Sequence, residues 1–237
     1  MSDTNWADKL AFYADQNVPV KVGFITAEEV DIKRRVEAFE SEVTTVVKNR
    51  KAELSKSEDA FRKNVRDMLR NGSYKPTGRG KPASEYLLKA AQKDDFPRIN
   101  PVVDINNYIS LKYLVPASQW DLDKVGFPKF FLKLGGAEES LVFNQSGQTI
   151  DIQDLVSIYG YNDEGEPKTP LLNPIKDSLG SKTDDTTRNV GAVVYLPAMD
   201  THIDPEWPTL DTVVDEYSYW LSQLASGAVK KHYPKPV

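Results

Sequence analysis

The stretch RINPVVDINNYISLKY, residues 98–113, predicts a buried helix that begins with a strong start signal. Asn100 can cap the first free N–H groups of a helix. Pro101 suits the first helical turn because its φ is already fixed near the helical value and its missing N–H is not needed there. The apolar residues that follow predict a helix over residues 101–114.

Two polar side chains interrupt this helix, since Asp104 and Asn107 are three residues apart and share one of its faces. A separate, apolar face is marked by Val102, Ile105 and Ile109. A buried polar group without a partner costs about 1–3 kcal/mol, so both side chains need partners. Two interpretations follow: Asp104 caps neighbouring N–H groups while Asn107 ties down a buried loop, or both side chains face a ligand.

Upstream of this helix the sequence is basic, although the whole chain is acidic, with 30 Lys and Arg against 35 Asp and Glu and a net charge of −5. From residue 70 to residue 93 the only acid is Glu85, and the basic residues are Arg70, Lys75, Arg79, Lys81, Lys89 and Lys93. The irregular segment SYKPTGRGKP leads into a short helix with Ser84 as its expected cap. The free N–H groups at the start of a helix favour the binding of anions. The charges predict either a solvated surface or a patch that faces phosphate.

The N-terminal part of the chain predicts two amphipathic helices with a scaffold role. Apolar residues at alternating steps of four and three predict the first helix over residues 28–54. The second helix follows at about 57–70, with Ser57 as its cap.

Short β-branched and aromatic runs predict a mostly antiparallel sheet over residues 129–196. A long polar connection at 162–189 interrupts it, and an amphipathic helix from about Leu210 precedes a mobile tail after Gly227. The order helices, sheet, helix is that of an α+β fold in which helices flank the sheet. We expect one compact unit with three segments: an N-terminal helical extension (1–70), a central domain (71–200), and a C-terminal helix and tail (201–237).

The composition of the 237-residue chain, 40% hydrophobic and 27% charged, is that of an ordinary globular protein. The absence of cysteine excludes disulfides and thiolate chemistry, and both histidines, His202 and His232, are expected at the surface, so no metal is predicted. No phosphate loop or dinucleotide fingerprint occurs, so no cofactor is predicted. The chain shows no targeting segment and no run near the roughly 20 apolar residues of a membrane span, which predicts a cytoplasmic protein.

Three motifs occur together: YKPTGRGKPASEYLL at 74–88, INPVVDINNYISLKYLVPASQWDLDKVG at 99–126, and DSLGSKTDDTTRNV at 177–190. Together they resemble the B3/B4 domain of the phenylalanyl-tRNA synthetase beta subunit, and still more the free-standing proteins that contain only this domain. The resemblance covers about residues 70–197. The chain departs from the synthetase pattern at Ser118, where many versions carry histidine, and near Leu179, where some carry an acidic residue.

In the synthetase, this domain hydrolyses the ester between tRNA and a wrongly attached amino acid. The resemblance therefore implies a tRNA-binding protein that hydrolyses a mischarged aminoacyl-tRNA in trans, without a synthetase catalytic core. The site residues that it implies are Asn107 in the pocket, Asp104 bracing it, and Lys182, Thr183, Thr186 and Thr187 on the connection that closes the pocket. The residues that it implies for tRNA phosphate are Lys75, Arg79, Lys81 and Lys89.

Two other classes of function stay open from the sequence. The same pocket could belong to a noncatalytic module that binds tRNA or a free amino acid, or the N-terminal helices could dock a partner protein. An aminoacyl ester is already activated, so its hydrolysis needs a positioned water, hydrogen bonds to the oxyanion and a pocket, and no protein nucleophile. The oligomeric state is not predicted.

Overall fold

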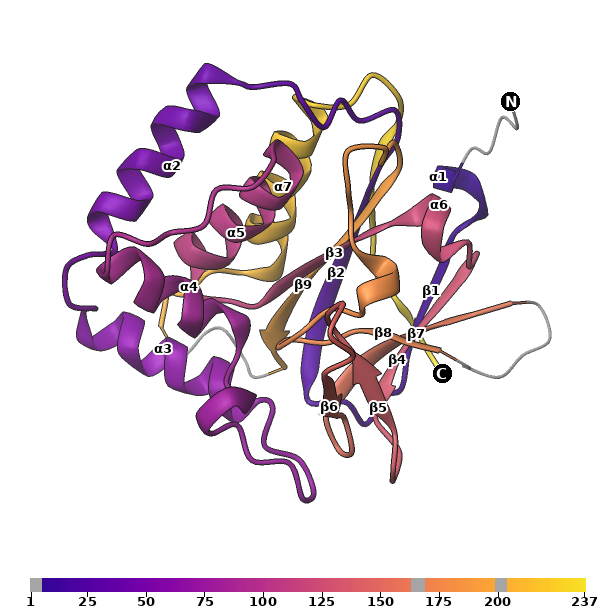
Figure 1. Ribbon diagram of the computed structural model, residues 1–237. Helices are drawn as coiled ribbons and strands as arrows, with labels where there is room; N and C mark the ends of the chain where they lie inside the picture. Colours follow the sequence, from indigo (N-terminus) through magenta and orange to yellow (C-terminus); the bar gives the residue numbers. More distant parts are fainter. Residues whose placement is uncertain (1–5, 163–168, 199–203) are drawn as a thin grey trace.

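A computed structural model describes residues 6–162, 169–198 and 204–237. Most helices lie together on one side of two β-sheets (Figure 1). The helices are α1 (Trp6–Lys9), α2 (Glu37–Asn49), α3 (Lys56–Asp67), α4 (Ala83–Gln92), α5 (Pro101–Tyr113), α6 (Leu122–Val125) and α7 (Leu210–Ser222), with short 3-10 turns at Gly78–Gly80 and Leu179–Ser181.

The central sheet is antiparallel throughout. Its strands, in spatial order, are β10 (Val229–His232), β2 (Val20–Ala27), β9 (Val190–Pro197) and β3 (Ala117–Asp121). Every residue of β9 is buried, as expected of a strand covered on both faces. Helices α5 and α7 pack on one face of this sheet, where a Cβ added at Gly23 would lie 2.4 Å from Val214. The missing side chain at Gly23 therefore lets α7 approach β2 closely.

The second sheet is mixed, because β1 is parallel to both of its neighbours while the other pairs are antiparallel. Its strands, in spatial order, are β11 (Lys235–Pro236), β1 (Ala11–Ala14), β4 (Lys129–Leu134), β7 (Val156–Tyr161) and β8 (Thr169–Leu172), and β5 (Ser140–Val142) pairs separately with β6 (Thr149–Asp151). The predicted α+β fold, with mostly antiparallel strands and flanking helices, is confirmed.

Aromatic side chains fill the space between the two sheets. Phe12 of the second sheet stacks on Phe24 of the central sheet with ring centroids 4.3 Å apart, and Trp120 lies 5.1 Å from Phe130. A Cβ at Gly191 would lie 2.2 Å from the Trp120 ring, so this position on β9 requires glycine. The core between the sheets thus fixes the position of β3, which carries Trp120.

A half-buried ion pair joins α5 to α7. The Glu216 carboxylate accepts hydrogen bonds from Lys112 Nζ at 2.7 and 2.8 Å, from the Tyr108 hydroxyl at 2.6 Å and from the Tyr113 hydroxyl. Burial raises the pKa of Glu216, but these hydrogen bonds outweigh it and hold the pKa below the usual glutamate value. The cluster therefore favours the ionised carboxylate and fixes the angle between the two helices.

The N-terminal helices differ from the prediction in their bounds and in one cap. The first is α2, which begins at residue 37 rather than 28, because Val30 instead forms a β-bridge with Ala225. The cap of α3 is Ser55 rather than Ser57: the Ser55 hydroxyl accepts from the Glu58 N–H, and the Glu58 carboxylate accepts from the Ser55 N–H.

The prediction of a mobile tail was wrong, and strands β1, β2, β3 and β8 were not predicted. Strand β8 lies within residues 162–189, which were expected to form a polar connection. Residues 229–232 pair with β2, and residues 235–236 pair with β1. Both sheets thus contain strands from near both ends of the chain. The segment boundaries at residues 70 and 200 stay a prediction.

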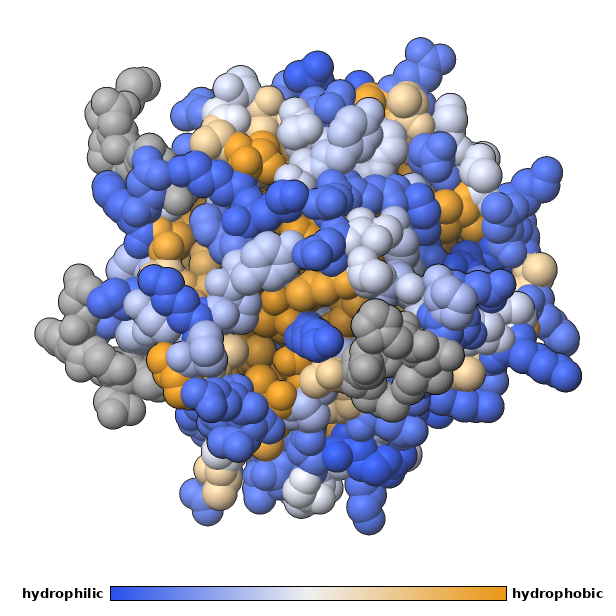
Figure 2. All heavy atoms as spheres, turned by 180° about the vertical axis from the view of Figure 1, so that it is seen from behind, coloured by the Kyte–Doolittle hydropathy of each residue, from blue (hydrophilic) through white to orange (hydrophobic). Residues whose placement is uncertain are grey.

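The surface seen from behind is hydrophilic over most of its area, with apolar residues gathered near the centre (Figure 2). Within the described ranges, no helix is long and apolar enough to cross a membrane.

Candidate functional site

The basic residues predicted to contact tRNA lie on helix α4 or in the segment just before it. The start of α4 is tied to the segment after β8, because the Ala83 N–H donates to the Pro174 carbonyl at 2.9 Å. Pro82, not Ser84, occupies the N-cap position. The residues predicted to contact tRNA all lie between Lys75 and the last turn of α4, and are at least partly exposed: Lys75, Arg79, Lys81 and Lys89. In the described part of the chain, none of these four cations forms an ion pair.

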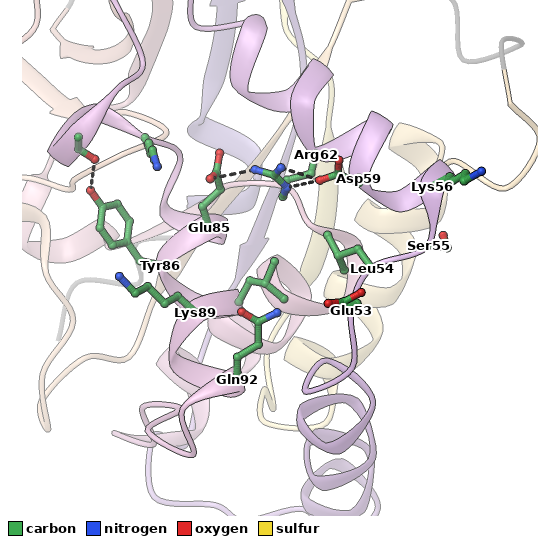
Figure 3. Close-up of a pocket in the computed structure, with 13 residues that line it drawn as sticks. Glu53, Leu54, Ser55, Lys56, Asp59, Arg62, Glu85, Tyr86, Lys89 and Gln92 are labelled. Carbon is green, nitrogen blue, oxygen red and sulfur yellow. Dashed lines mark hydrogen bonds and ion pairs between the residues drawn. The ribbon is translucent and has the colours of Figure 1, made fainter.

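Two clefts flank Tyr86, which projects from α4 and is 44% exposed. The first cleft, of about 730 Å³, lies between the start of α3 and α4, and its lining includes Arg62, Lys81, Tyr86 and Lys89. Figure 3 shows Tyr86 and Lys89 on the α4 side of this cleft. The second cleft, of about 680 Å³, is lined by Arg79, Tyr86, Phe143, Gly147, Gln148, Thr149, Ile150 and Lys176. An exposed aromatic ring therefore stands between two cavities. The lining of the first includes Lys81 and Lys89 but also the acids Glu53, Asp59 and Glu85, whereas the charged residues that line the second, among those described, are Arg79 and Lys176.

Glu85, the only acid of the basic stretch, is neutralised by α3. Its carboxylate accepts from Arg62 Nη1 at 3.1 Å and from Arg66 Nε at 2.5 Å. Arg62 also contacts Asp59 at 2.6 Å (Figure 3). The charge of Glu85 is thus neutralised within the protein, and among the described residues no acid lines the second cleft beside Arg79 and Lys176.

Asp104 braces the start of α5. Its buried carboxylate accepts from Arg98 Nε at 2.9 Å and from the Ile99 N–H at 2.7 Å. Arg98 in turn contacts Glu40 on α2 at 2.6 Å, and Asn100 caps α5 by accepting from the Val103 N–H at 3.0 Å, as the sequence predicted. The observed contacts of Asp104 are those of the capping interpretation.

The buried amide of α5 is Asn106 rather than Asn107. Asn106 donates to the Ala117 carbonyl at 3.3 Å and accepts from the Tyr217 hydroxyl at 2.9 Å. Asn107 is half-buried, and among the described residues its amide makes no hydrogen bond. Asn107 is therefore free to meet a ligand, and its role in a pocket stays a prediction.

The predicted closing connection is held by the turn at the end of β3. Thr187 donates to Asp121 Oδ2 at 2.6 Å, and Lys124 Nζ donates to Asp184 at 2.6 Å and to the Lys182 carbonyl at 3.0 Å. Lys182 Nζ reaches the Phe143 carbonyl at 2.7 Å, next to the second cleft. Residues 163–168 of this connection lie outside the described residues.

The catalytic residues implied by the resemblance fall into two groups. Asp104 and Asn107 lie on α5, whereas Lys182, the half-buried Thr183 and Thr187 lie beside α6. No hydrogen bond or ion pair among the described residues joins the two groups. Their joint action stays a prediction.

A polar cluster that the sequence did not predict lies where the start of α4, strands β3 and β9, and the segment 173–178 meet. The Ser118 hydroxyl donates to the Asn173 carbonyl at 3.3 Å, and residue 174 is the acceptor that ties down α4. Within the described residues, five buried side-chain atoms of this cluster have no hydrogen-bond partner: Ser84 Oγ, Asn173 Nδ2, Asp177 Oδ1, Ser178 Oγ and Tyr195 Oη. Buried polar groups are nearly always paired, so these atoms mark a place for water or ligand.

Asp177 is the ionisable centre of the polar cluster. Burial raises its pKa to about 7, although the Ser118 hydroxyl, Lys182, Lys176 and the Gln119 backbone each lower it. Burial and the neighbouring Asp177 charge raise the pKa of Tyr195 well above its usual value, so its hydroxyl remains a donor. A carboxyl group that changes charge near neutral pH can take and return a proton.

Within the described ranges, no group of three or more His, Asp or Glu side chains could hold a metal ion. His202 lies outside the described residues. His232 was expected at the surface but is half-buried on β10, with Nε2 3.0 Å from the Thr26 hydroxyl, and burial lowers its pKa.

Comparison with known proteins gives a family match. A family model described as the B3/4 domain matches residues 76–199. A solved N-terminal fragment of the phenylalanyl-tRNA synthetase beta subunit from Pyrococcus horikoshii aligns with 93% of this chain at 10% identity and a TM-score of 0.47, and the chain spans 50% of that fragment's length. No curated protein matches the sequence.

Proposed function

The chain belongs to the B3/4 domain family, and from this premise we propose that it binds aminoacyl-tRNA and hydrolyses the ester of a mischarged one in trans. The observation that carries the proposal is the surface of α4, where cations without ion partners in the described structure lie on both sides of the exposed ring of Tyr86.

This surface has the two features that a single-stranded nucleic acid end requires. Phosphate groups are attracted by unpaired cations, here Arg79, Lys81 and Lys89, and bases stack on exposed aromatic rings such as Tyr86. The first and second clefts could thus hold consecutive nucleotides of the acceptor end on either side of the ring.

The chemistry also suits the residues of this chain. The ester of an aminoacyl-tRNA needs a positioned water and donors for the oxyanion, and the protein has no cysteine to act as a nucleophile. We assign the pocket role to Asn107, whose amide is free in the described structure, and positioning roles to Asp104, Lys182, Thr183 and Thr187. A tRNA substrate implies a cytoplasmic location, which stays a prediction.

A panel of mischarged tRNAs tests the proposal. Purified protein should release amino acid from at least one of them faster than buffer does, and Asn107→Ala should lower that rate. If the protein binds tRNA and releases no amino acid, the protein is a noncatalytic tRNA-binding module. Failure to bind any tRNA, together with thermal stabilisation by a free amino acid, would point to a small-molecule binder.

The salt dependence of tRNA binding tests the assigned surface. Replacing a phosphate-contacting cation should reduce the slope of log affinity against log salt by about one. Lys89→Ala should show this change, and Lys33→Ala, which removes an exposed lysine from the loop before α2, should not. Equal slopes for both variants would exclude α4 as the phosphate-binding surface.

A further inference from the structure

We propose that Asp177 is the general base of this site, activating the water that attacks the aminoacyl ester, with Tyr195 and Asn173 as donors to the oxyanion. The assignment rests on the proposed function. The third motif of the family begins at Asp177, whereas Asn173 and Tyr195 lie outside the three motifs. The unpaired polar atoms of the polar cluster carry the assignment.

In the described structure, the polar cluster holds more unpaired polar atoms than a buried region normally does. Asn173 and Tyr195 are 1% and 0% exposed, yet the Asn173 amide nitrogen and the Tyr195 hydroxyl have no partner among the described residues. Leaving a buried polar group unpaired costs about 1–3 kcal/mol, so such a cluster is stable only if water or another polar group satisfies it. An oxyanion site consists of such donors, fixed in place and not yet paired with an acceptor.

The polar cluster combines an acceptor with donors. Among the described residues, Asp177 Oδ1 is a buried acceptor without a partner, while Asn173 Nδ2 and the Tyr195 hydroxyl are donors. A base next to donors is the pair that ester hydrolysis requires, because the attacking water must lose a proton while the carbonyl oxygen gains charge.

The second cleft lies next to the segment that carries Asp177. Lys176, the residue before Asp177, lines the second cleft together with Arg79 and Tyr86. The start of α4 contacts Pro174 in the same segment. A tRNA end bound along α4 would therefore bring its terminal ester toward the segment that carries Asp177.

The reaction balances with these groups alone. The water oxygen attacks the ester carbonyl carbon, and its proton passes to Asp177 Oδ1. The tetrahedral oxyanion accepts hydrogen bonds from Tyr195 and Asn173. The bond from carbon to the ribose oxygen then breaks, and Asp177 returns the proton to that oxygen, releasing the free amino acid and the tRNA.

The charge state of Asp177 depends on groups from every element packed around it. These are Ser118 and Gln119 on β3, Tyr195 on β9, Tyr217 on α7, and Lys176 and Lys182 on its own segment. Burial is the largest influence and raises the pKa of Asp177 to about 7. The ionised base should therefore form as the pH rises through 7, and the rate should rise with it.

Single-turnover deacylation by Asp177→Asn tests the assignment. A general base contributes about 100- to 10,000-fold, so the rate constant should fall at least about 100-fold and lose its rise near pH 7, while the affinity for the charged tRNA is retained. Tyr195→Phe removes a hydroxyl that has no partner in the described structure, and should lower the rate about 100-fold at an unchanged pH midpoint. Asp185→Asn, an exposed carboxylate on the same connection, is the matched control and should keep the wild-type rate.

Denaturant unfolding separates this role from a structural one. Because burial disfavours the charged carboxylate, Asp177→Asn should unfold at the same or a higher denaturant concentration at pH 8. A clear fall in the unfolding midpoint, or a rate within threefold of wild type, would overturn the assignment while leaving the deacylase function intact. No ester loss with the wild-type protein on any mischarged tRNA would overturn the function and the assignment together.

Discussion

Removing the Asp104 carboxylate should unfold the protein more easily, whereas removing the Asn107 amide one turn further along α5 should not. Asp104 holds two hydrogen bonds that close the start of the helix, from Arg98 at 2.9 Å and from the Ile99 N–H at 2.7 Å. Asn107 makes none in the described structure and is half-buried. The two substitutions thus separate the scaffold residue of the motif from its candidate ligand residue.

The magnitude follows from the number and exposure of these bonds. A hydrogen bond to a charged group contributes about 1.5–3 kcal/mol, and the lower end applies because Arg98 is 34% exposed and keeps its contact with Glu40. Two such bonds give about 3 kcal/mol for Asp104→Ala. Asp104→Asn keeps an acceptor and should cost about half as much. Asn107→Ala should stay within about 0.5 kcal/mol, since alanine also favours the helix.

Urea unfolding followed by circular dichroism measures these differences. The midpoint should fall for Asp104→Ala at an unchanged slope, because the same surface is exposed on unfolding. A loss under about 1 kcal/mol for Asp104→Ala would refute the bracing role. A loss above about 2 kcal/mol for Asn107→Ala would show that its amide has a structural partner, and would remove it as a ligand residue.

Three further results are expected. Glu216→Gln should lower the free energy of unfolding at pH 7. The difference from wild type should vanish as the pH falls through the lowered pKa of Glu216, because only the ionised carboxylate stabilises the fold. Unfolding curves from pH 7 to 3 measure this difference. Gly191→Ala should cost about 3 kcal/mol by collision with Trp120, whereas Gly180→Ala, with no atom within 4 Å of its added Cβ, should cost far less; thermal unfolding compares the pair. Tyr86→Ala should weaken single-stranded RNA binding by about 1–3 kcal/mol without changing its salt slope; an unchanged affinity would exclude stacking on this ring.

The fold class followed from local sequence patterns, but several strands did not. β7 and β9 are β-branched and aromatic runs between turn residues, and their pattern was sufficient to predict them. Strands β10 and β11 contain Lys230, Lys231 and Pro236, which have little preference for sheets. They are strands because β2 and β1 offer them open edges, and that is a property of the tertiary structure.

The sequence could predict only those parts of the site that lie on a single helix or strand. Residues 102, 105, 106 and 109 form one stripe of a helix, so the spacing alone was enough to predict that Asn106 is buried. The sequence interpretation instead assigned the polar role to Asp104 and Asn107. Asp177 and Tyr195 are near each other only because β9 and the segment after β8 meet. No spacing along the chain predicts such a meeting.

The residues that identify the family are, in this structure, mainly those that hold the chain together. Asp121 caps α6 and accepts from Thr187, and Asp123 accepts from Trp6 Nε1 at 2.8 Å, across 117 positions of sequence. Their hydrogen-bonding capacity is used for the fold, as that of Asp104 is. A motif made of such residues is evidence of the fold, and it carries little information about the reaction. The chemistry of this protein is therefore to be sought in polar atoms that lack a partner in the described structure, above all in Asp177 Oδ1.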